Sequence, residues 1–203
     1  VVTLLRGCGG SPAGEAGHIV DAVSMLESME GEEKPLLGRR VVVYGGGNTA
    51  MDAARTAARL GAEPLIIYRR TRDQMPAHDF EADEAIEEGV KIHWLRTIKE
   101  IDGTTLHVEV MKLDENRYPV PTGEIETLEA DSLVLALGQD VDLSLLDGVP
   151  GLEIKDGTVQ VAPNMMTGHA GIFAGGDMVP AERTVTVGVG HGKKAARHID
   201  AWL

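Results

Sequence analysis

The chain has 203 residues, of which 43% are hydrophobic and 25% are charged, the balance of a globular protein with one large domain or two small ones. Its 19 Lys and Arg residues against 32 Asp and Glu residues give a formal net charge of −13, which disfavours nucleic-acid and anionic-membrane partners, because phosphate binding relies on basic side chains. No apolar run approaches the roughly 18 residues that span a bilayer, and the first residues lack the pattern of a secretory signal.

The single cysteine, Cys8, limits the redox chemistry that this chain can perform with its own side chains. One thiol forms neither an internal disulfide nor a redox dithiol, and it does not hold an iron–sulfur cluster or a structural zinc by itself. A redox role would therefore depend on organic cofactors. A lone cysteine also fits a reducing cytoplasm, where we expect the protein. No catalytic triad or metal-ligand spacing is legible, so we expect no metal site.

The first third of the chain leads into a strongly patterned α/β unit. Residues 1–17 show no clear periodicity, whereas apolar residues at helical spacing predict a helix over 18–30, followed by a polar connector. β-branched apolar runs then predict buried parallel strands at 40–44, 65–68 and 90–94, with helices at 48–60 and 80–88 between them. The acidic face of the second of these helices is interpreted as a solvated surface. This βαβαβ arrangement is Rossmann-like and doubly wound.

The remaining residues predict a β-meander and a second α/β segment. Alternating apolar and polar residues around 106–110 indicate a half-buried antiparallel strand, and the meander extends over 98–130. A buried strand is expected at 132–136, short strands at 157–161 and 171–174, and a helix from Thr184 to Leu203. We therefore divide the chain into an N-terminal segment and linker helix (1–37), a nucleotide-binding domain (38–130) and a C-terminal segment (131–203).

The sharpest motif is Gly45-Gly46-Gly47-Asn48-Thr49-Ala50, a G-x-G-x-x-A between a predicted strand and a predicted helix. Gly45 permits a tight turn, Gly47 lets the backbone approach a pyrophosphate, and Ala50 keeps the helix close to the sheet. The N-terminus of the helix would then hold the anion. The alternative is a glycine turn that binds no ligand.

The end of the second strand indicates which dinucleotide binds. An NAD site places an acidic residue there, whereas this chain has Tyr68-Arg69-Arg70, with Arg72 close behind. Guanidinium groups bind phosphate bidentately, so an adenosine 2′-phosphate is favoured and NADPH is expected rather than NADH. The alternative is a solvated basic turn that balances an acidic protein.

A second glycine-containing motif, Gly171 to Asp177, follows near the C-terminus. Asp177 has the chemistry to accept hydrogen bonds from sugar-like hydroxyls, and the helix start at Thr184 to meet a pyrophosphate or a flavin carbonyl. Gly-Gly-Asp also forms ordinary turns, which is the alternative. For His191, a structural or solvent-facing role is expected.

Together these motifs resemble the glutamate synthase small-subunit family of FAD-dependent pyridine nucleotide oxidoreductases. The resemblance covers roughly residues 18–203 and is specific as a set. The matching stretches are Val41–Arg55, Tyr68–Arg72 with Met75–Ala77, Ala136–Gln139, Ile172–Asp177 and Gly190–Ala196.

The resemblance implies a flavoprotein of the type with two dinucleotide-binding domains, in which hydride passes from NADPH to FAD and electrons leave through iron–sulfur centres. It also implies residue roles. The glycine motif would bind the NADPH pyrophosphate, the two arginines the 2′-phosphate, and Asp177 the FAD ribityl chain. Beside the flavin would lie Gly176, Thr184 and Val185, and the crossing between the domains would contain Gly138 and Gln139.

The chain departs from the family in two respects. It contains no second G-x-G-x-x-G for the FAD adenosine and no cysteine-rich region, so the FAD domain is expected to be partial. The missing FAD and iron–sulfur portion would come from a longer polypeptide or from a partner redox subunit. The alternative functions are an NADPH-binding module without flavin, or an interaction protein whose glycine loops are structural.

Overall fold

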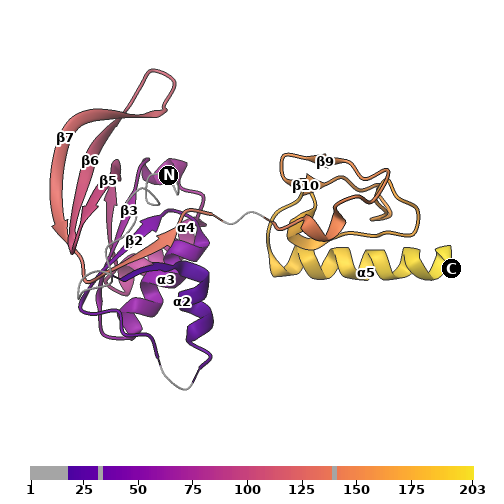
Figure 1. Ribbon diagram of the computed structural model, residues 1–203, viewed down its shortest axis with the longest axis horizontal. Helices are drawn as coiled ribbons and strands as arrows, with labels where there is room; N and C mark the ends of the chain where they lie inside the picture. The colour runs from indigo at the N-terminus through magenta and orange to yellow at the C-terminus, as the bar shows by residue number, and fades with distance from the viewer. Residues whose placement is uncertain (1–17, 32–33, 139–140) are drawn as a thin grey trace. The chain divides into compact units, whose positions relative to one another are not determined.

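The computed structural model describes residues 18–31, 34–138 and 141–203, and the chain divides into two units after Gly138 (Figure 1). Cys8, Gln139 and the segment 1–17 lie outside the described residues. The expected boundary between residues 130 and 131 would separate strand β8 (Ser132–Ala136) from the sheet of the first unit, so the structural division comes later than the sequence suggests.

A five-stranded parallel sheet forms the centre of the first unit and confirms the α/β prediction. β8, which comes last in the sequence among these five strands, lies between β1 and β2, and Val42 and Ile19 both pair with Leu133. The strand order is β1 (His18–Asp21), β8, β2 (Arg40–Gly45), β3 (Glu63–Tyr68) and β4 (Lys91–Trp94).

The helix predicted over residues 18–30 is wrong in its first turn. Residues 18–21 form β1, and helix α2 covers only Ala22–Ser28. The carboxylate of Asp21 accepts the N–H groups of Val23 and Ser24 at 3.0 and 3.2 Å, so it caps the helix and ends the strand. Pairing with β8 supplies the backbone hydrogen bonds that make the preceding residues a strand.

Helices cover one face of the sheet and the meander covers the other (Figure 1). Val41 and Val43 pack under α2, α3 (Asn48–Arg59) and α4 (Asp79–Glu87), whereas Val42 and Tyr44 pack against the meander, as the two-residue period of a strand requires. Alanine at four of the five buried positions of α3 lets this helix lie close to the strands.

The acidic side of α4 is not merely solvated. Arg55, on α3, forms ion pairs with Glu88 at 2.5 Å and Glu84 at 3.0 Å, and its side chain is only 18% exposed. Arg72 forms an ion pair with Asp83. These contacts attach α4 to its neighbours, while Asp83, Glu84, Glu87 and Glu88 stay exposed, so the predicted solvated face is confirmed and also carries ion pairs.

The predicted meander is confirmed as an antiparallel sheet of β5 (Arg96–Asp102), β6 (Thr105–Leu113) and β7 (Pro119–Glu129). Leu106 and Val108 are buried, and they face the parallel sheet.

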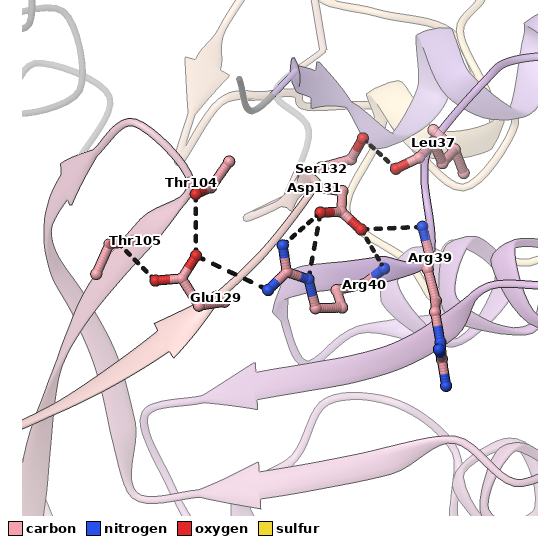
Figure 2. A network of polar contacts seen from close by, with 8 residues as sticks. All are labelled: Leu37, Arg39, Arg40, Thr104, Thr105, Glu129, Asp131 and Ser132. Carbon is pink, nitrogen blue, oxygen red and sulfur yellow. Dashed lines mark hydrogen bonds and ion pairs between the residues drawn. The ribbon is translucent and has the colours of Figure 1, made fainter. Parts of the chain in front are cut away.

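A network of hydrogen bonds and ion pairs joins residues at the edge of the parallel sheet where its strands begin (Figure 2). The guanidinium of Arg40 donates to one oxygen of Asp131 at 2.6 Å, and the N–H groups of Arg39 and Arg40 donate to the other at 3.0 and 2.8 Å. The Arg40 side chain is the largest cause that lowers the pKa of Asp131 to about 2. Ser132 donates to the carbonyl of Leu37 at 2.6 Å. The connector before β2 is thereby fixed to the start of β8.

The second unit is small, with a core around Val159, Met165, Ala174 and Val179. The predicted C-terminal helix is confirmed as α5 (Val185–Trp202). The strand predicted at 171–174 is wrong, because only an isolated bridge joins Met166 and Phe173. The strand predicted at 157–161 is shorter than expected. The other elements are η2 (Ser144–Leu146), β9 (Ile154–Lys155), β10 (Thr158–Val159) and η3 (Gly176–Met178).

Candidate functional site

The glycine turn joins the end of β2 to the start of α3, as the motif predicts. Gly45 has a φ of +153°, and a Cβ there would lie 2.1 Å from the carbonyl oxygen of Ala136. A Cβ on Gly46 would lie 2.4 Å from the ring of Tyr68. At Gly47, by contrast, a Cβ would meet nothing within 4 Å. The first two glycines therefore serve close packing, and the third leaves open space before the helix.

The start of α3 has the character of an anion site. Gly47 is its N-cap and provides no side-chain acceptor for the first N–H groups of the helix. These N–H groups and the helix dipole favour a negative charge. Ala50 is fully buried, so the helix lies close to the sheet, and Thr49 is half-buried in the first turn.

The side chain of Asn48 contacts the segment around Pro76. Its Oδ1 accepts the N–H of His78 at 3.1 Å, and next to it the N–H of Ala77 donates to the carbonyl of Gly46 at 3.0 Å. The segment around Pro76 is thereby fastened to the glycine turn. A pyrophosphate contact by the backbone of Asn48 stays a prediction, whereas its side chain holds this segment.

Residues 69–74 follow β3 and are called the arginine loop here. Among the residues that the structure describes, Arg69 and Arg70 form no ion pair, whereas Arg72 is paired with Asp83. Arg69 is exposed. Arg70 is half-buried, and its Nε is buried without a hydrogen-bond partner. Two cations therefore remain available to an incoming anion, and one of them has an unsatisfied donor.

Tyr68, the last residue of β3, forms a hydrogen bond with the arginine loop. Its hydroxyl donates to the carbonyl of Gln74 at 2.8 Å, and its ring meets Trp94 edge-on at 6.2 Å. Burial raises the pKa of Tyr68, although the positive charges of Arg70 and Arg69 oppose this shift. The phenol therefore stays protonated at neutral pH and keeps its donor role.

The topology brings the glycine turn, the arginine loop and Gly138 to one edge of the parallel sheet. β3 and β8 both pair with β2 in parallel, so the residues that follow the three strands lie at the same edge. The glycine turn follows β2, the arginine loop follows β3, and Gly138, which is exposed, comes shortly after β8. The structure thus brings together the predicted residues of the first unit.

The second unit holds the remaining predicted residues near the start of α5. Gly176 has a φ of +68° and begins η3, and Asp177 is exposed. His191 Nδ1 accepts the N–H of Gly176 at 3.1 Å, which bears out a structural role for this histidine. Thr184 caps α5, since its hydroxyl accepts the N–H of Val187 at 3.2 Å. Val185 is 85% exposed.

Two contacts of the arginine loop are not evident in any sequence motif. Gln74 and Asp73 both contact Arg117, which lies in the turn between β6 and β7. The run Asp114-Glu115-Asn116 predicts that turn, but nothing in the sequence indicates which segment it meets. Within the described ranges, no group of three or more His, Cys, Asp or Glu side chains is placed to hold a metal ion, and no helix is long and apolar enough to cross a membrane.

A family comparison decides what kind of protein has this arrangement. The sequence profile described as "Pyridine nucleotide-disulphide oxidoreductase" matches residues 6–194. The chain belongs to this family.

Relatives in the family carry names that agree with the expected resemblance. The chain is 41% identical to the NADP(+)-dependent formate dehydrogenase subunit beta of Moorella thermoacetica, over 92% of this chain and 28% of that protein. It is 32% identical to the NADPH-Fe(3+) oxidoreductase subunit beta of Geobacter sulfurreducens, over 97% and 34%. It is 34% identical to the glutamate synthase [NADPH] small chain of Azospirillum brasilense, over 95% and 45%. The resemblance is confirmed, and the chain spans less than half the length of these relatives.

Solved structures confirm the fold class. Thioredoxin reductase from Lactococcus lactis matches with a TM-score of 0.71 at 21% identity, over 92% of this chain and 58% of that one. Thioredoxin reductase from T. acidophilum matches with a TM-score of 0.72 at 21% identity, over 92% and 57%. At this identity the likeness concerns the fold alone.

Proposed function

We propose that the chain is the NADPH-binding part, together with a C-terminal piece of the FAD-binding part, of an NADPH-dependent flavin oxidoreductase. The proposal rests mainly on Arg69 and Arg70, which form no ion pair among the described residues. They lie at the same sheet edge as the start of α3, where no side chain caps the helix. A dinucleotide with a 2′-phosphate needs an anion site for its pyrophosphate and a second one for its extra phosphate.

The residues present fit NADPH. The open space at Gly47 admits a pyrophosphate, and the first N–H groups of α3 would donate to it. The guanidinium of Arg70, which forms no ion pair among the described residues, would donate to a 2′-phosphate. Ala50 and the buried face of α3 hold the helix in place against the sheet. These side chains bind and orient, and none of them needs to move a proton.

FAD fits the second unit in part. Asp177 is exposed, and its carboxylate is a suitable acceptor for ribityl hydroxyls. The N-terminus of α5, with Val185 exposed beside it, would face a flavin carbonyl. When bound, the two cofactors supply hydride transfer from the nicotinamide to the flavin, a reaction that depends mainly on proximity and orientation.

The proposal includes an onward electron acceptor outside this chain. The names of two relatives, a formate dehydrogenase beta subunit and an Fe(3+) oxidoreductase beta subunit, support a protein that works beside other redox subunits. The remaining FAD and iron–sulfur portion would be supplied by a longer polypeptide or by a partner redox subunit. We therefore propose electron transfer to an iron–sulfur or comparable acceptor and do not name the final substrate.

The nucleotide assignment is tested with the double variant Arg69→Ala/Arg70→Ala and titrations of NADPH and NADH on the purified chain. Loss of two charge-assisted contacts to phosphate should weaken NADPH binding by roughly 30-fold or more and leave NADH binding unchanged. Arg72→Ala is the matched control, because this arginine is already paired with Asp83. Unchanged NADPH affinity in the double variant would overturn the assignment.

A visible absorption spectrum distinguishes the flavoenzyme from a nucleotide-binding module. The purified chain is measured alone, after FAD is added and unbound FAD removed, and after NADPH is added. A retained flavin band that bleaches with NADPH supports the flavoenzyme. Absence of retained flavin, with NADPH still bound, supports a chain that binds NADPH and needs another portion to hold FAD.

A further inference from the structure

The turn between β6 and β7 presents Arg117 in a defined conformation. Asp114 Oδ1 accepts the N–H groups of Asn116 and Tyr118 at 2.9 and 2.8 Å, so hydrogen bonds inside the turn fix its backbone conformation. Arg117 has a φ of +63°, the left-handed region that costs free energy for a residue with a side chain. A strained backbone conformation of this kind persists where contacts with neighbouring residues hold it. At Arg117, some of these contacts come from the arginine loop.

Two contacts join Arg117 to the arginine loop. The side-chain amide of Gln74 donates to the carbonyl of Arg117 at 2.8 Å. The guanidinium of Arg117 forms an ion pair with the carboxylate of Asp73, and this carboxylate also accepts the hydroxyl of Thr71 at 2.6 Å. One contact uses the backbone and the other the side chain, so a substitution of the side chain leaves the first in place.

The negative charge of Asp73 opposes phosphate binding at a nearby site. Hydrogen bonding from Thr71 lowers its pKa, and the charge of Arg117 lowers it further, so this side chain is an anion at neutral pH. It follows Arg70 by three residues, which places the two within about 11 Å along the chain, where charges still interact. A carboxylate free to move there would repel a phosphate or pair with Arg69 or Arg70 itself.

We propose that Arg117 determines selectivity for the 2′-phosphate by holding Asp73, so that Arg69 and Arg70 stay free for the ligand. This inference rests on the proposed NADPH site. Arg117 is a positioning residue, because it acts through the carboxylate of Asp73. The meander thereby takes part in nucleotide recognition, although it contributes no residue to the glycine turn or to the arginine loop.

The test is a charge-rescue experiment on the full chain at low ionic strength. Adenosine 2′,5′-bisphosphate and 5′-AMP are titrated calorimetrically against the wild type, Arg117→Ala and Arg117→Ala/Asp73→Asn. Arg117→Ala should weaken binding of the bisphosphate by about three- to tenfold and leave 5′-AMP unchanged, because only the 2′-phosphate meets the released carboxylate. The double variant should bind the bisphosphate within about twofold of the wild type, because the competing charge is gone.

Arg39→Ala is the matched control, since it removes a guanidinium from an exposed ion pair with Glu63 where the strands of the sheet begin. It should leave both affinities unchanged. Wild-type affinity for the bisphosphate in Arg117→Ala, equal losses for both probes, or no recovery in the double variant would each overturn the inference. If Arg69→Ala/Arg70→Ala loses selectivity while Arg117→Ala keeps it, only the role of Arg117 fails. If neither variant loses selectivity, the proposed NADPH site fails as well.

Discussion

The carbonyl oxygen of Ala136 lies 2.1 Å from the position that a Cβ atom on Gly45 would take. The two residues are register partners at the ends of β2 and β8. The first glycine of the motif is therefore required by the neighbouring strand, in addition to the turn that it permits. A substitution there acts on the fold before it acts on a ligand.

Gly45→Ala should destabilise the first unit by more than about 2 kcal/mol, because the added methyl group must displace backbone and the φ of +153° is strained for alanine. The free energy of unfolding in urea measures this effect. NADPH binding should be lost together with the folded unit. An unfolding midpoint equal to that of the wild type would show that β8 moves away at no cost.

Gly47→Ala is the matched comparison within the same motif. A Cβ at this position meets nothing within 4 Å, so the free energy of unfolding should change by no more than about 1 kcal/mol. The methyl group would instead occupy the space before α3, and NADPH affinity should fall. The same affinity as in the wild type would argue against a pyrophosphate at this helix start.

Asp131→Asn should reduce stability in a manner that depends on pH. The folded-state pKa of Asp131 is about 2, below its ordinary value of 3.8, so the carboxylate contributes stability that is complete above about pH 4 and is lost as the pH falls toward 2. Urea unfolding between pH 2 and 6 should show a difference between wild type and variant that closes over this range. A difference that is constant with pH would show that the charge of Asp131 is not the cause.

His191→Ala should expose the amide of Gly176. The variant removes the acceptor of this N–H, which should destabilise the second unit by about 1–2 kcal/mol and speed hydrogen exchange at Gly176. Retention of FAD should weaken too, because the same loop presents Asp177. His198→Ala, an exposed histidine on the same helix, is the control. Exchange at Gly176 that is no faster than in this control would contradict the structural role.

Much of the first unit could be predicted from local pattern. β-branched runs with glycine or charged residues at their ends identify β2 and β3, and alanine at helical spacing identifies α3, because these signals arise within a few residues. β1 could not be predicted in this way. Its four residues are a strand only because they pair with residues 132–135, more than a hundred positions away.

The candidate site likewise has features that local sequence predicts and features that depend on contacts between distant segments. The glycine motif and Arg69-Arg70 stand out by residue type and position relative to predicted strands. The engagement of Arg72 by Asp83 and the contact of Asp73 with Arg117 depend on how α4 and the meander pack, so the sequence alone does not reveal them. The first of these contacts leaves Arg69 and Arg70 as the two cations of the loop without an ion pair in the described residues, and the second engages the carboxylate of the loop.

The central position of β8 has a consequence for synthesis. The ribosome makes this strand after every other described element of the first unit, yet among the described strands β1 pairs with β8 alone. A nascent chain that ends before residue 132 therefore leaves β1 without β8 and leaves one edge of β2 without this partner. The first unit completes its sheet only when Ala136 has left the exit tunnel, so a shorter product is exposed to aggregation and proteolysis.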